Sequence, residues 1–346
     1  MESTAIGFPP LTVGVFIVLA IIALGIDLIT HRKDKPVTLL NASIWSVFWV
    51  AISLVFAGFL YVSHGSEVSS LFLTGYALEK VLSVDNLFVF MAIFAWFKIP
   101  DEYRHRVLYW GIIGAIVFRA IFVVIGTSLL SFGPWVEIVF AGIVAYTAVV
   151  MLKGGDDDEE EDYAKHPAYR FGSKLFSVWP KLHGHSFFIS RDEVNEELKK
   201  PENDGVSFVQ KGKWIATPLL LCVMVVELSD VLFAFDSVPA IIAVSKEPLI
   251  VYSAMIFAIL GLRTMYFVLE ALKGYLVHLE KAVVALLFFI AAKLGLNATN
   301  SLFDHGYAID ANSSLLVVLV VLAIGILASW VFPEKEESPV DSGKEI

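Results

Sequence analysis

Two short stretches of the sequence repeat one arrangement of acidic and small polar residues. They are EKVLSVDN at 79–86 and DVLFAFDS at 230–237, related by a constant offset of 151 residues. That offset pairs Glu79 with Asp230, Asp85 with Asp236, and Asn86 with Ser237. Carboxylates, an amide and a hydroxyl supply only oxygen ligands, and the eight histidines fall in loops or near the ends of apolar runs. Such a set favours calcium, magnesium or manganese over zinc or copper.

Both stretches lie inside long apolar runs, where an acidic side chain costs roughly 2.5–3.5 kcal/mol on an insertion scale. The acids placed in this way are Glu79, Asp85, Glu227, Asp230 and Asp236. Arg119 and Arg263 can neutralise two of them, whereas Lys80 and Lys293 are placed nearer to span ends or interfaces. The remaining carboxylates would either take up protons or hold a cation. The alternative is that all of these charges pair with one another and serve only as scaffolding.

The composition places the chain in a membrane. Of the 346 residues, 57% are hydrophobic and 17% charged, and the mean hydropathy is +0.74. A soluble core of this size could not bury so much apolar surface. Apolar runs long enough to cross about 30 Å of hydrocarbon occur at 11–30, 43–62, 71–97, 107–127, 135–152, 214–238, 249–272, 282–296 and 313–332. We therefore predict an all-α membrane protein with about nine transmembrane helices.

The basic residues predict an orientation for these spans. Lys and Arg gather in the connections at 31–42, 98–106 and 273–281, and none occurs in those at 63–70, 128–134 and 297–312. Because basic connections stay in the cytoplasm, the N-terminus is expected outside and the C-terminus inside a bacterial inner membrane. Lys246 is the exception among the outer connections.

With nine spans, the two acidic stretches cross the membrane in opposite directions. Spans 3–5 and 6–8 would then form an inverted three-helix repeat, as in many secondary transporters. A second similarity, RAIFVVI at 119–125 with RTMYFVL at 263–269, supports this. On a straight helix Asp236 points away from Glu227. Either the helices unwind near Asp85 and Asp236, or the acids form two layers; Pro239 favours a kink or an early end.

The predicted organisation has five parts. They are two peripheral helices at 1–70, the first repeat at 71–152, a charged cytoplasmic connection at 153–213, the second repeat at 214–296, and a ninth helix with a tail at 297–346. The connection contains the acidic run DDDEEED at 156–162, typical of a solvated segment and also able to collect cations.

At these residues the chain resembles the TerC family of bacterial membrane proteins. The resemblance rests on EKVLSVDN, on ELSDVLFAFDSVPAI, and on flanking sequence such as RHRVLYWGIIGAIVFR at 104–119. It implies roles in a metal site for Glu79, Asp85, Asn86, Glu227, Asp230, Asp236 and Ser237. The family includes members implicated in manganese efflux, and its link to tellurium resistance implies cytosolic tellurium-resistance proteins as partners.

We therefore expect a secondary transporter that exports a divalent cation, manganese first, with calcium or magnesium as alternatives. The rival expectation is a membrane scaffold that does not transport and docks cytosolic resistance proteins through 153–213. The acidic spans disfavour a carrier for tellurite, which is itself an anion. The sequence carries no phosphate loop or nucleophile motif, so neither enzymatic activity nor a prosthetic group is expected. A net charge of −10 argues against nucleic acid as a partner, and a homo-oligomer is left open.

Overall fold

The structure is a computed structural model that describes residues 7–30, 38–154, 167–200, 214–272 and 279–331. Within these ranges the side chains of a few residues, Asp85 and Asp236 among them, lie outside the description. The elements are α1 (Pro10–Thr30), α2 (Leu39–His64), α3 (Ser66–Trp96), α4 (Asp101–Leu129), η1 (Leu130–Phe132), α5 (Pro134–Gly154), α6 (Pro167–Leu175), β1 (Phe188–Ser190), α7 (Arg191–Glu197), β2 (Trp214–Ala216), α8 (Pro218–Val244), α9 (Pro248–Ile259), α10 (Leu262–Leu272), α11 (Leu279–Phe303) and α12 (Ala311–Val331).

Among the described residues, seven helices are long and apolar enough to cross a membrane: α1, α2, α4, α5, α8, α11 and α12. The bent pair α9 and α10 meets the same test jointly and makes a possible eighth span. The prediction of an all-α, multi-pass membrane protein is confirmed at this level. α3 has 31 residues, but Glu79, Lys80 and Asp85 interrupt its apolar sequence. The predicted count of nine therefore depends on α3.

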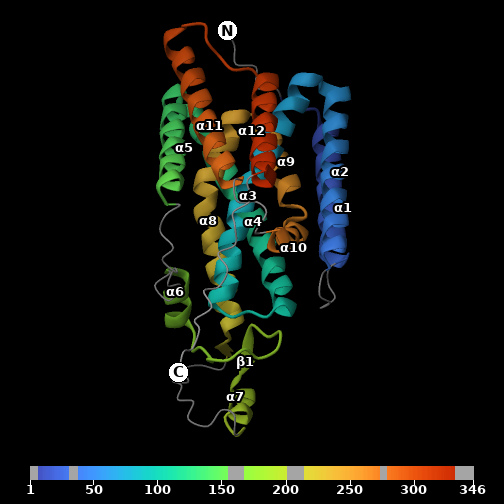
Figure 1. The fold of residues 1–346 in the computed structure, drawn as a ribbon, viewed down its shortest axis with the longest axis vertical. Helices are drawn as coiled ribbons and strands as arrows, with labels where there is room; N and C mark the ends of the chain where they lie inside the picture. Colours follow the sequence, from blue (N-terminus) through green and yellow to red (C-terminus); the bar gives the residue numbers. More distant parts are fainter. Residues whose placement is uncertain (1–6, 31–37, 155–166, 201–213, 273–278, 332–346) are drawn as a thin grey trace, which may run out of the picture.

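The long helices form an elongated bundle with α3 and α4 near its middle (Figure 1). The most extensive helix pairings are α5 with α11, α4 with α8, and α3 with α9. α1 and α2 lie together at one edge of the bundle in Figure 1, and α12 packs against α3 and α11. Large apolar side chains such as Leu40, Val62 and Trp330 are exposed on these outer helices. That distribution suits a surface that faces lipid rather than water.

Aromatic packing joins the edge helices to the middle of the bundle. Phe56 of α2 stacks on Phe257 of α9, with ring centroids 4.9 Å apart, and meets Phe72 of α3 edge to face at 5.1 Å. All three side chains are fully buried. This cluster fixes α2 against α3 and α9, the helices that surround the predicted site.

The backbone corrects one expectation about the acidic stretches. α3 runs without interruption through Asp85, and α8 runs through Asp236 and Pro239 as far as Val244. Local unwinding at these positions was therefore a wrong prediction. The break occurs in the predicted run 249–272, where α9 ends at Ile259, α10 begins at Leu262, and the two axes are bent by 53°.

The connection between α5 and α8 contains a small folded unit. It comprises α6, the antiparallel pair β1 and β2, and α7, and lies below the bundle in Figure 1. Trp179, Ile189, Val194 and Ile215 form its buried apolar cluster. α6 packs against α8, so the unit is anchored to the bundle. The acidic run 156–162 lies outside the described residues.

Candidate functional site

The centre of the candidate site is an arginine held between two carboxylates. Arg119 of α4 forms an ion pair with Glu79 of α3 and another with Asp230 of α8, the latter at 3.1 Å from Nη2 to Oδ1. Glu79 is 0%, Arg119 1% and Asp230 4% exposed. The structure therefore brings together one acid from each repeated stretch at an arginine of α4, a helix that packs extensively against α8. One guanidinium cannot neutralise both carboxylates, so this group keeps a negative charge.

A third acid lies on the same side of α8. The Glu227 carboxylate lies against the backbone of Gly114 on α4, so closely that a Cβ at Gly114 would overlap it. Glu227 and Asp230 are three residues apart, so both project from α8 towards α4. A larger residue at 114 would occupy the space that the carboxylate fills, so the Glu227 side chain would have to move.

Several oxygens on α3 and α8 are buried without a hydrogen-bond partner among the described residues. They are Oε2 of Glu227, Oδ2 of Asp230 and the hydroxyl oxygens of Ser83 and Ser237. Buried acceptors of this kind are rare and costly in folded proteins unless a proton, a water or a cation meets them. The group can therefore accept a positive ligand.

The remaining predicted site residues lie on the same two helices. Asn86 of α3 is 8% exposed and Ser237 of α8 is 3% exposed, so both polar side chains are inside the bundle. Asp85 and Asp236 belong to α3 and α8, and their side chains lie outside the described residues. Among the described residues, no group of three His, Cys, Asp or Glu side chains is placed so that it could hold a metal ion. A ligand set completed by Asp85 and Asp236 therefore stays a prediction.

A small cavity adjoins Asp230. It has a volume of about 20 Å³, which matches roughly one water-sized particle. Its walls come from α3, α4, α8 and α10: Leu87, Phe90, Leu108, Gly111, Ile112, Ala115, Asp230, Leu262 and Arg263. Asp230 and Arg263 are the charged residues in this lining, and the other lining residues are apolar.

Arg263 has a partner that sequence reasoning missed. Its Nη2 lies 2.7 Å from Oδ2 of Asp27 in α1, and it also bonds to the Asp27 backbone carbonyl. Both side chains are buried, at 1% and 0% exposed. Arg263 therefore balances an acid outside the repeated stretches, although it also lines the cavity beside Asp230. An acid at 27 inside the first apolar run was the available signal.

Lys80 was also misplaced by the sequence reading. It occupies the middle of α3, and its ammonium donates to the backbone carbonyls of Ala258 at 3.1 Å and Leu260 at 3.2 Å. Lys293 is likewise 2% exposed in the middle of α11, although the sequence predicted a position nearer to a span end. The intramembrane charges therefore include four cations, Lys80, Arg119, Arg263 and Lys293, and a sixth acid, Asp27. Six acids against four cations leave an excess of two.

Two further ion pairs lie at opposite ends of the bundle. Arg104, in the first turn of α4, pairs with Glu270 of α10. Lys246, which follows α8, lies 2.5 Å from Glu137 near the start of α5. Glu137 is 5% exposed in its side chain, and the sequence reading overlooked it. The first pair joins α4 to α10, and the second joins α5 to the residues that follow α8, so each links 71–152 to 214–296.

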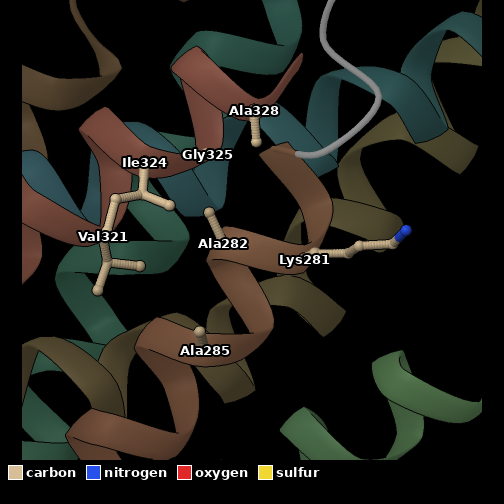
Figure 2. Close-up of a pocket in the computed structure, with 7 residues that line it drawn as sticks. All are labelled: Lys281, Ala282, Ala285, Val321, Ile324, Gly325 and Ala328. Atoms are coloured by element: carbon tan, nitrogen blue, oxygen red, sulfur yellow. The ribbon is translucent and has the colours of Figure 1, made fainter. Parts of the chain in front are cut away.

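A larger groove lies elsewhere and carries none of this chemistry. It has a volume of about 680 Å³ between α11 and α12, and Figure 2 shows its lining of small and aliphatic side chains. Its one charged residue, Lys281, extends away from Val321 and Ile324 (Figure 2). None of the predicted site residues lines this groove, so it is not the candidate site.

Comparison with known proteins supports the family resemblance. Residues 64–337 match the family described as "Integral membrane protein TerC family". The chain is 70% identical to "Tellurium resistance protein TerC" of Serratia marcescens, over 98% of this chain and 99% of that protein. It is 68% identical to the protein of the same name from Alcaligenes sp, with the same coverage.

More distant relatives bear another name. The chain is 35% identical to "Putative membrane-bound redox modulator Alx" of Photorhabdus laumondii, over 93% of this chain and 95% of that protein. No solved structure matches the chain. The family match covers most of the sequence and includes both acidic stretches, and the chain accordingly belongs to the TerC family of integral membrane proteins.

Proposed function

We propose that the chain is a secondary transporter that exports a divalent metal cation, with manganese as the first candidate. The observation that carries this proposal is the buried group around Arg119, where two carboxylates share one guanidinium and Glu227 lies beside them. Its excess negative charge and unpartnered oxygens favour a cation and repel an anion such as tellurite. A tellurium-resistance phenotype, which the names of the relatives suggest, would then be an indirect effect of metal balance.

The choice of metal rests on the ligand types. Glu79, Asp230 and Glu227 offer carboxylate oxygens, and the neighbouring serines and Asn86 offer hydroxyl and amide oxygens. Manganese, magnesium and calcium accept such ligands, whereas copper and zinc are usually held by imidazole or thiolate. The soft side chains of α8, Cys222 and Met224, pack in an apolar cluster.

We infer that α3 is a ninth span and that the inverted repeat is real. A two-fold axis in the membrane plane would exchange α3 with α8, the α9–α10 pair with α4, and α5 with α11. Under that exchange the pairing of α3 with α9 becomes that of α8 with α4, and the pairing of α5 with α11 maps onto itself. These are the three most extensive helix pairings in the bundle. The packing thus supports a repeat that sequence similarity first suggested.

The proposed orientation puts the α6–β2 unit and the basic connections in the cytoplasm. Lys246 is a basic residue in a connection that this orientation places outside, where few basic residues are expected. Its ion pair with the buried Glu137 offers a reason, because the lysine charge is neutralised locally. An inner membrane with the N-terminus outside therefore stays our proposal for the cellular location. We also propose that the chain is not an enzyme.

The function can be tested by metal flux in reconstituted vesicles. Purified protein in proteoliposomes should carry Mn²⁺ down an imposed gradient, and Asp230→Asn should reduce the flux at least about tenfold, because the site loses a buried charge. Glu67→Gln is a matched control, since Glu67 is an exposed acid at the start of α3. Equal flux in wild type and Asp230→Asn would contradict the proposal.

One observation favours a second function, that of a docking scaffold. The α6–β2 unit has its own buried cluster around Trp179 and Val194, so it is a folded surface and not only a tether. If cytosolic resistance proteins bind there, exposed changes on α7 such as Asp192→Lys should abolish resistance and leave Mn²⁺ flux intact. Under the transport proposal, Asp230→Asn should instead abolish both Mn²⁺ flux and resistance, because resistance then depends on metal balance.

A further inference from the structure

The break between α9 and α10, which form the seventh of the nine proposed spans, is imposed by local sequence. Gly261 lies between α9 and α10 with a φ of +79°, a conformation that residues with side chains rarely adopt. A Cβ at this position would also overlap the indole of Trp49 in α2, which is 1% exposed. The bend of 53° is therefore a built feature of the fold.

A break of this kind leaves backbone carbonyls without partners. The last turn of a helix has carbonyl groups that no intrahelical N–H reaches, and inside a membrane each needs another partner. The carbonyl of Gly261 is satisfied within the start of α10, since it accepts from the backbone N–H of Met265 and from the Thr264 hydroxyl, both at 2.9 Å. The carbonyls of Ala258 and Leu260 converge on the ammonium of Lys80, at 3.1 and 3.2 Å.

The position of the Lys80 ammonium has the chemistry of a cation site. Two carbonyl oxygens converge there at the C-terminal end of α9, where the helix dipole places partial negative charge. Asp27 is close enough to act on Lys80 electrostatically. Carbonyls at the ends of broken membrane helices bind alkali cations in the same way. Glu79, the residue before Lys80, is directed to Arg119 instead.

We propose that the break in the seventh span forms a monovalent-cation position, and that the Lys80 ammonium fills it as a tethered cation that fixes the bend. Lys80 is then a positioning residue, because the bend places Leu262 and Arg263 at the cavity beside Asp230. This role in transport rests on the proposed function, whereas the cation position itself does not. The chain consequently needs no free alkali cation at this place.

Thermal stability of the purified full chain tests the cation position without any transport assay. Lys80→Met keeps an unbranched stem of the same length and removes the ammonium group at its end. We expect this variant to unfold several degrees higher in NaCl or KCl than in choline chloride at equal ionic strength. Wild type and Lys174→Met, a change at an exposed lysine of α6, should unfold at the same temperature in all three salts.

A second variant guards against failure of Lys80→Met to fold. Lys80→Gln can still donate one hydrogen bond to a carbonyl, and we expect the same direction of response with a smaller shift. Salt-independent unfolding of both variants would overturn the proposal, as would an equal alkali response in wild type. Flux in the same preparations separates the two proposals. If the wild-type chain moves no Mn²⁺ but alkali salts stabilise Lys80→Met, the cation position is supported and the transport proposal is refuted.

Discussion

The Glu227 carboxylate occupies the place on α4 where a side chain of residue 114 would stand. The carboxylate can take this position only because Gly114 has no Cβ. A glycine and a carboxylate from different halves of the chain therefore form one structural unit beside the Arg119 group.

Substitution of Gly114 by alanine should displace Glu227 from this position. We expect Gly114→Ala to cost about 1–3 kcal/mol of stability, as overpacking does, and to reduce Mn²⁺ flux without loss of membrane insertion. Gly58→Ala in α2 is the control, because a Cβ there meets nothing within 4 Å. Flux and unfolding temperature measured on both variants check this. A Gly114→Ala protein with wild-type flux would show that Glu227 does not contribute at its present position.

Removal of the central arginine should destabilise the bundle more than removal of either acid. Arg119→Ala leaves Glu79 and Asp230 buried without their cation, and breaking a buried ion pair costs about 3–5 kcal/mol. Adding Glu79→Gln and Asp230→Asn to Arg119→Ala should restore most of the lost stability and none of the flux. Thermal unfolding in detergent checks the first part. No recovery in the triple variant would mean that Arg119 stabilises the fold by packing alone.

The Asp27–Arg263 pair should behave as a structural tie between α1 and α10. Each neutral single variant, Asp27→Asn or Arg263→Gln, should lower stability strongly, and the double variant should recover part of the loss. A double-mutant cycle of unfolding temperatures provides the measurement. Additive losses would indicate that the two residues act separately.

The ion pair between Lys246 and Glu137 should restrict access to the site from the side that we propose faces outward. In a Cys222→Ala background, Ser237→Cys places the only thiol of the chain at a buried position of α8. We expect little labelling by an impermeant thiol reagent from outside. Addition of Glu137→Gln, which removes the partner of Lys246, should increase that labelling several-fold. Addition of Asp192→Asn on α7 is the control. Equal labelling in all three would mean that the Lys246 pair is no barrier.

Sequence patterns predicted the helices well because apolar run length is a strong signal in membrane proteins. Seven of the predicted runs each correspond to one helix. The run 214–238 begins in β2 before it enters α8, and the run 249–272 falls on the pair α9 and α10. Pro239 favours a kink or an early end in α8, but α8 continues past it and the break lies between α9 and α10. A lost N–H near the end of α8 costs one hydrogen bond, and the helix continues because ending it would leave more carbonyls unpaired. Gly261 breaks its span through its left-handed backbone, which composition alone does not reveal.

The candidate site was predictable where the repeat gave two copies to compare. Glu79 and Asp230 share an offset, and they meet at Arg119. Asp27 and Glu137 have no counterpart at that offset, so comparison within the chain could not find them. The position of Lys80 was missed for another reason, because its partners are backbone carbonyls. No side-chain pattern marks such partners, and only the fold brings them to the lysine.

Equilibrium binding of Mn²⁺ to the purified chain tests most directly whether the buried acids hold a divalent cation. Binding of radioactive Mn²⁺ should saturate at about one ion per chain and should resist competition by tellurite. Asp230→Asn should weaken binding by about 10–100-fold or more, whereas Asp192→Asn on α7 should leave it unchanged. Identical binding by wild type and Asp230→Asn, or competition by tellurite at the same site, would contradict a cation site around Arg119.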